Sequence, residues 1–300
     1  MMTQLELNCV GKSLDISRTR LQQLVLHASG TEEITLNGSL WRLAINGDTS
    51  RLKSVRCPFD GELLSVQLEL NGGEFCIRGL EKLRDLRIFS QRGEYIDLAC
   101  VAASFPNLRE IFINAQGGTL KNIDALAKFK HLKDVWLSDV YGFGRFPTRA
   151  QLPHLKRLWL WSAPKSACEA ARAQFKDIEN FAVRQPRSKQ WLAANLNNPL
   201  RGWDGREGVS AATAKKAMKA YIDAHKKLSA LEAKPARDEL KTEKTEILKE
   251  FIAVFNAIDA KHSIDTMERE EIWEAFCKLA KLAAMDTKAQ DAIWETNAEF

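Results

Sequence analysis

Large aromatic side chains recur at a fixed spacing in the middle of this 300-residue chain. Phe112, Trp136 and Trp159 are 24 and 23 positions apart, and each stands between two aliphatic residues. Because alternate side chains of a β-strand point to opposite faces, these rings would face away from a core formed by their neighbours. Trp161, two residues after Trp159, shares that direction. Exposed rings of this kind favour binding chemistry, since aromatic and arginine side chains dominate protein-binding hot spots.

Further side chains join this predicted binding surface. Arg87 and Phe89 occupy outward positions one spacing earlier in the chain. Charged residues with the same direction are expected to form a rim that orients a partner: Arg42, Arg56, Glu110, Asp134 and Arg157. Three alternatives remain open. The C-terminal part of the chain could cover the rings, the rings could simply pack on one another across strands, and the rim could be ordinary solvated surface.

The sequence offers little for catalysis or for metal binding. It contains no G-x-S-x-G segment, no phosphate-binding loop and no dinucleotide-binding fingerprint. The five histidines lack metal-ligand spacing, and the six cysteines form no C-x-x-C pair. We therefore expect a reduced protein without catalytic residues, structural zinc or cofactor. The segment 203–207 (W-D-G-R-E) is interpreted as a capped joint rather than as a site.

The elements that must position the aromatic residues follow from a repeated pattern. Three copies of L-x-x-L-x-L start at Leu108, Leu132 and Leu155. A period of 20–29 residues with this pattern is typical of leucine-rich repeats, and the chain resembles that family in its bacterial stand-alone form. The resemblance implies an α/β fold, a right-handed solenoid of about nine repeats with a parallel sheet on one face. Stacked repeats of this kind share one core.

Nine strands are predicted from apolar pairs separated by one residue. The pairs are Leu5/Leu7, Leu24/Leu26, Leu43/Ile45, Val66/Leu68, Leu86/Ile88, Ile111/Ile113, Val135/Leu137, Leu158/Leu160 and Phe181/Val183. Shorter alternating segments predict that the first half of the chain returns in short strands: Leu14/Ile16, Ile34/Leu36, Val55/Cys57, Phe75/Ile77 and Ile96/Leu98. Later returns are expected to be a helical turn over 122–129 and a helix over 166–176, which Ser166 and Glu169 would cap.

The periodicity changes after residue 190. Residues 191–209 are rich in Asn, Gly and Pro and predict a joint, whose tryptophans indicate that it is packed down. Beyond it the pattern is helical, with apolar residues at i, i+3 and i+4 over 237–259 and expected caps at Asp265 and Asp286. The sequence thus predicts a repeat solenoid over 1–190, the joint over 191–209 and a small all-α bundle over 210–300.

The resemblance also supplies an alternative function. Secreted bacterial ubiquitin ligases of the leucine-rich-repeat family join a solenoid to a helical domain with a nucleophilic cysteine in a C-x-D motif. The corresponding triplet here, Cys277-Lys278-Leu279, lacks the acid, so Cys277 is expected to be a core thiol. A third hypothesis is an adaptor whose helical tail forms oligomers.

Composition and charge favour a soluble binding protein as the first hypothesis. Apolar residues make up 45% of the chain, yet no apolar run approaches the ~20 residues that span a bilayer. The first residues form neither a basic nor an apolar region, so we expect no secretory signal. Residues 1–190 hold 27 lysines and arginines against 20 aspartates and glutamates. We therefore expect a cytoplasmic, non-enzymatic module that binds an acidic protein rather than nucleic acid or a membrane, for example an immunity or antitoxin protein.

Overall fold

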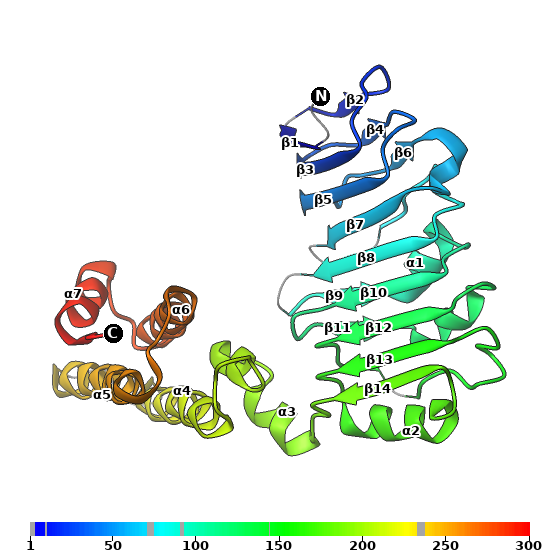
Figure 1. Ribbon diagram of the computed structural model, residues 1–300. Coiled ribbons are helices and arrows are strands. Elements are labelled where there is room, and N and C mark those ends of the chain that lie inside the picture. The colour runs from blue at the N-terminus through cyan, green and yellow to red at the C-terminus, as the bar shows by residue number, and fades with distance from the viewer. Residues whose placement is uncertain (1–3, 10, 71–74, 91–92, 144, 233–237) are drawn as a thin grey trace. The chain divides into compact units, whose positions relative to one another are not determined.

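The computed structural model describes residues 4–9, 11–70, 75–90, 93–143, 145–232 and 238–300. The chain divides into two compact units, Met1–Lys189 and Gln190–Phe300, and each is described by itself. The first is an α/β structure, and the second consists of helices (Figure 1). None of the described helices is both long and apolar enough to cross a membrane.

A parallel sheet of nine strands dominates the first unit (Figure 1). Each strand is hydrogen-bonded in parallel to the next long strand along the chain. The strands are β1 (Gln4–Cys9), β3 (Gln23–Ser29), β5 (Arg42–Asp48), β7 (Ser65–Leu70), β8 (Asp85–Ser90), β10 (Glu110–Asn114), β12 (Asp134–Ser138), β13 (Arg157–Trp161) and β14 (Asn180–Arg184). All nine predicted strands are confirmed. Their registers align every predicted apolar pair, from Leu5 on β1 to Phe181 on β14.

Alternation along each strand separates the core from the opposite face of the sheet, which we call the outward face. On β12, Val135 and Leu137 are buried whereas Trp136 between them is half-buried. The same alternation on neighbouring strands stacks aliphatic side chains into one continuous core. Burial of each such side chain contributes about 1.5–3 kcal/mol. The core therefore fixes which side chains the outward face presents.

Between the long strands the chain passes through short elements, several of which form two smaller parallel sheets. One sheet contains β2 (Ser13–Asp15), β4 (Glu33–Thr35) and β6 (Ser54–Arg56), and the other joins β9 (Tyr95–Asp97) to β11 (Thr119–Lys121). The expected short strands are confirmed around Leu14, Ile34, Val55 and Ile96. Ile77 lies outside any strand, beside an isolated bridge between Ser54 and Arg78.

Helical returns complete the first unit, and one of them begins differently from the prediction. They are η1 (Pro58–Gly61), α1 (Leu98–Ser104), η2 (Ile123–Lys128) and α2 (Lys165–Phe175). The 3₁₀-helix η2 confirms the helical turn expected over 122–129. The prediction that Ser166 caps α2 is wrong, because Pro164 occupies the N-cap and no side chain caps the helix. The Lys165 N–H donates to the Arg187 carbonyl at 2.8 Å instead, so a neighbouring segment supplies the acceptor.

The second unit is built on α4 (Ala211–Glu232), α5 (Asp238–His262), α6 (Thr266–Leu282) and α7 (Thr287–Asn297), preceded by α3 (Lys189–Asn195) and η3 (Pro199–Trp203). As predicted, Asp265 caps α6, in a capping box with Glu268, and Asp286 caps α7. The segment predicted as a joint belongs to this core, since Leu200 and Trp203 are fully buried among the helices.

Candidate functional site

The outward face of the nine-stranded sheet carries the aromatic residues predicted to bind a partner. The register places one row of side chains between the two core positions of each strand: Glu6, Val25, Ala44, Gln67, Arg87, Phe112, Trp136, Trp159 and Ala182. The row changes from small or polar residues to three aromatic ones and back to a small one. A second row, two residues further along each strand, adds Phe89 and Trp161, which Asn114 and Ser138 separate.

Four rings on this face form one group, the aromatic cluster: Phe89, Phe112, Trp136 and Trp159. Ring centroids are 5.4 Å apart for Phe89 and Phe112, and 6.2 Å apart for Phe112 and Trp136. Trp136 and Trp159 stack at 4.3 Å with their planes 9° apart. Cross-strand packing, one of the alternatives left open by the sequence, is therefore present. It holds the rings in place and leaves each residue half-buried rather than covered.

Two indole N–H groups on the outward face, those of Trp159 and Trp161, have hydrogen-bond acceptors. Trp159 Nε1 donates to Asn180 Oδ1 at 3.0 Å, and Trp161 Nε1 donates to Gln185 Oε1 at 3.0 Å. Trp161 remains 46% exposed and is the most open of the predicted aromatic residues. The bonds orient both indoles and leave apolar ring surface for contact with another molecule.

Two residues predicted to belong to the charged rim, Asp134 and Arg56, do not belong to it. Asp134 is only 5% exposed, because Arg157 of the next strand donates to it from Nε and from Nη2, each at 2.6 Å. Arg157 itself stays exposed and lies 4.0 Å from Glu110. Arg56 is on β6, in a different sheet, 3.7 Å from Glu33. Asp134 therefore offers no exposed charge, and Arg56 does not belong to the outward face.

The surroundings of Glu110 oppose its ionisation. Partial burial raises the pKa of its carboxyl above the ordinary value of 4.5, and the charges of Asp134 and Asp85 raise it further. A raised pKa means that folding disfavours the charged form, so the penalty is present above the folded pKa and is lost well below pH 4.5.

We expect Glu110→Gln to increase the free energy of unfolding at pH 7 by less than about 1 kcal/mol, since solvent screens a half-exposed carboxylate. The gain should disappear well below pH 4.5. Urea unfolding of both proteins at the two pH values measures it, and a variant that is less stable than wild type at pH 7 would contradict the assignment.

A hollow of about 250 Å³ lies on the outward face beside the aromatic cluster. Its lining residues come from the start of β5, β7 and β8: Trp41, Arg42, Ser65, Gln67, Asp85 and Arg87. The small side chain of Ser65 leaves room for the hollow, because it lies on β7 between the larger Arg42 of β5 and Asp85 of β8. Sequence reasoning found Arg42 and Arg87 but missed Trp41. Aligning the outward positions of successive strands, to find a small residue between large ones, would have indicated the hollow.

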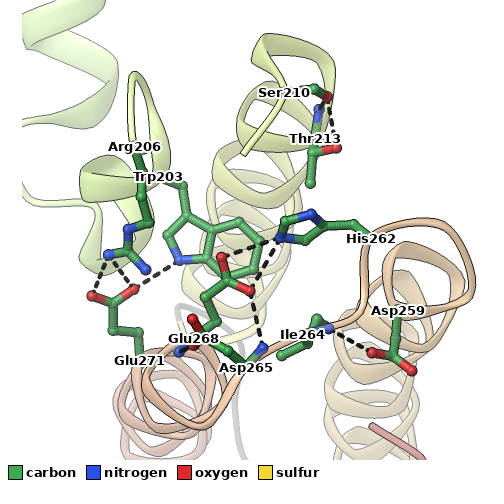
Figure 2. A network of polar contacts seen from close by, with 10 residues as sticks. All are labelled: Trp203, Arg206, Ser210, Thr213, Asp259, His262, Ile264, Asp265, Glu268 and Glu271. Atoms are coloured by element: carbon green, nitrogen blue, oxygen red, sulfur yellow. Dashed lines mark hydrogen bonds and ion pairs between the residues drawn. The ribbon is translucent and has the colours of Figure 1, made fainter. Parts of the chain in front are cut away.

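A cluster of polar contacts lies in the helical unit (Figure 2). Trp203 Nε1 donates to Glu271 at 2.8 Å, and the Arg206 guanidinium donates to both oxygens of the same carboxylate at 2.6 and 2.8 Å. The buried Glu268 lies with both oxygens 3.1 Å from His262 Nε2. The contacts of Trp203 and Arg206 tie the segment before α4 to α6, and the contact of His262 ties the end of α5 to α6.

Cys277 lies on α6 and is half-buried. Burial raises the pKa of its thiol above the ordinary value of 9.0, and a raised pKa reduces the thiolate, which is the nucleophilic form. This environment disfavours the ligase-like alternative. In the part of the chain that the structure describes, no three His, Cys, Asp or Glu side chains are grouped as metal ligands.

Comparison with known proteins leaves the outward face to be interpreted from its own geometry. No protein-family model matches the chain, and no match was found among curated proteins.

Proposed function

We propose that the first unit is a leucine-rich-repeat solenoid that acts as a non-enzymatic protein-binding module. Support for the repeat assignment comes from the L-x-x-L-x-L segments at residues 108, 132 and 155, the nine strands in chain order and the short returns between them. Stacked repeats present continuous rows of side chains across many strands. Such rows suit an extended partner.

The aromatic cluster is the observation that carries the binding proposal. Its four rings remain half-exposed on the face opposite the core, where they are not needed to close that core. Their mutual contacts fix them before any partner arrives, so binding buries apolar surface with little loss of side-chain entropy. Rigid aromatic anchors with polar neighbours are typical of the centre of a binding hot spot.

Arginine side chains around the cluster support a partner that carries acidic groups. Arg42, Arg87 and Arg157 are exposed on the outward face, and Arg157 already covers the charge of Asp134. The basic excess of residues 1–190 acts in the same direction, since complementary charge steers association. A protein that masks the acidic functional surface of another, as an immunity or antitoxin protein does, is one form of this function.

Trp136→Ala combined with Trp159→Ala is expected to weaken partner binding at least about a hundredfold. Truncation of a central aromatic anchor costs about 2 kcal/mol or more, and here two stacked anchors are lost. The partner is captured with the wild-type chain from an extract of its native cells, purified, and titrated calorimetrically against both proteins.

Tyr95→Ala is the matched control, because Tyr95 lies on β9, outside the nine-stranded sheet. It should bind the purified partner with wild-type affinity. Circular dichroism checks that all variants fold. If the double variant retains wild-type affinity while folded, the outward face is not the binding surface.

A further inference from the structure

We infer that the hollow lined by Trp41, Arg42, Ser65, Gln67, Asp85 and Arg87 receives an acidic side chain from an extended segment of the protein partner. This inference rests on the proposed function and adds the chemistry and the length of the segment that the outward face binds. It commits to an acidic protein segment, and the alternatives, a small free anion and a second copy of this chain, are outcomes of the test.

The hollow has room and polar groups for one carboxylate. Its volume of about 250 Å³ opens over β7, whose outward residues Ser65 and Gln67 form part of the lining. Arg42 on β5 and Arg87 on β8 stand on either side of β7. The strands are about 4.8 Å apart, so two long guanidinium side chains can converge on an oxygen pair placed between them.

Charge at the hollow favours an anion. Arg42 and Arg87 form no ion pair with any residue that the structure describes. The one carboxylate of the lining, Asp85, accepts a hydrogen bond from the Ser65 hydroxyl at 2.6 Å. Two guanidinium groups without an ion pair therefore line the hollow beside one hydrogen-bonded carboxylate, and the charge of Glu110 acts on Arg87 from the next strand. The lining itself carries a net positive charge, which favours an anion over a cation. At the other end of the aromatic cluster, Arg157 is already paired with Asp134.

Continuity with the aromatic cluster favours a protein segment over a free anion. Arg87 is the direct register partner of Phe112 on the next strand, and Phe112 is the partner of Trp136. On the opposite side of the hollow, the Trp41 indole is 47% exposed and offers apolar surface. A chain with its carboxylate between the arginines would run directly onto the rings.

The register sets the length of this segment. From β7, over which the carboxylate would lie, to β13, which carries Trp159, the sheet has four successive strand pairings. Four spacings of about 4.8 Å make about 19 Å, which about six residues of extended chain span. The segment is therefore expected to carry an acidic residue at one end and apolar residues at alternate positions after it.

Synthetic peptides test this inference on the full-length chain. The probe is an acetylated, amidated octapeptide with glutamate at one end, phenylalanine at alternate later positions and serine between them. Its twin carries glutamine in place of the glutamate, and both are also made in reverse order. By titration calorimetry, the glutamate peptide of one order should bind at least tenfold more tightly than its twin. In nuclear magnetic resonance spectra, addition of this peptide should shift the Nε–Hε signals of Arg42 and Arg87.

Charge-matched variants locate the preference. Arg42→Gln with Arg87→Gln, which we call the hollow variant, should bind the glutamate peptide and its glutamine twin equally. Arg172→Gln with Lys176→Gln removes the same charge from the exposed side of α2 and its end, and should preserve the preference. Equal binding of the twins to wild type, a preference that survives in the hollow variant, or no binding of any peptide up to millimolar concentration would overturn the inference.

Two further readouts separate the alternative occupants and the two proposals. If inorganic phosphate shifts both arginine signals and displaces the peptide at equal concentration, the hollow is a small-anion site. If the wild-type chain forms a dimer that Arg42→Gln with Arg87→Gln dissociates, the hollow is a self-association site. Either result overturns the inference. If the twins bind equally but Trp136→Ala with Trp159→Ala abolishes the binding of both, the inference fails while the proposed function stands.

Discussion

Leu137→Ala is expected to lower the free energy of unfolding of the first unit by about 2–5 kcal/mol. Leu137 on β12 is almost completely buried, and its register partners Ile113 and Leu160 are buried on both sides of it. Truncation removes apolar contacts and leaves a cavity, because neighbouring strands held by hydrogen bonds cannot close in on the vacated space. Since β12 pairs only with β10 and β13 in the described sheet, the loss should weaken the middle of the sheet most.

Leu63→Ala is the matched control for this substitution. Leu63 precedes β7 and is 70% exposed, so the same chemical change there should cost less than about 0.5 kcal/mol. Urea unfolding followed by circular dichroism gives both values, and hydrogen exchange at the β12 amides shows where protection is lost. An unchanged transition for Leu137→Ala would mean that the alternation on β12 has been assigned to the wrong faces.

The nine strands could be predicted because their signal is local. In each strand, two apolar residues flank one other residue, and burial of that pair determines which face turns inward. Alignment of Leu5 with Leu24, and of each later pair with the next, then follows from spacings of roughly 20 residues. Neither the pattern nor the spacing depends on how distant side chains fold over one another.

Features set by partners on other strands could not be predicted. Asp134 has outward direction, as expected, but Arg157, 23 positions later, folds over it and covers it. Ser166 fits a cap by sequence, yet the Arg187 carbonyl reaches the Lys165 N–H and the helix begins one residue earlier. In both cases a contact from the next coil of the chain overrides the local preference.

The hollow was missed for a different reason. It depends on a small side chain at an outward position, since Ser65 lies between the larger register partners Arg42 and Asp85. A search for chemically active residue types passes over small side chains. Comparing outward positions across successive strands, instead of along one strand, shows that a small residue lies beside the flanking arginines.

Trp203→Ala is expected to lower the free energy of unfolding of the helical unit by about 3–5 kcal/mol. Trp203 is fully buried, its ring centroid lies 6.0 Å from that of Phe255 on α5, and its N–H donates to Glu271 on α6. Truncation would empty a site that α5 and α6 share with the preceding segment, and Glu271 would lose one of the donors drawn in Figure 2.

Two variants separate the contributions of packing and hydrogen bonding at this position. Trp203→Phe keeps most of the ring but removes the N–H, so it should cost about 1–3 kcal/mol, the loss of one hydrogen bond to a charged acceptor together with some volume. Trp161→Ala, at an exposed tryptophan of the first unit, should leave the helical transition unchanged. If Trp203→Ala unfolds at the wild-type urea concentration, residues 191–209 are a connection that the helices do not need. A large loss shows instead that this segment is part of their core, so any shortened form of the helical unit must begin before Leu200.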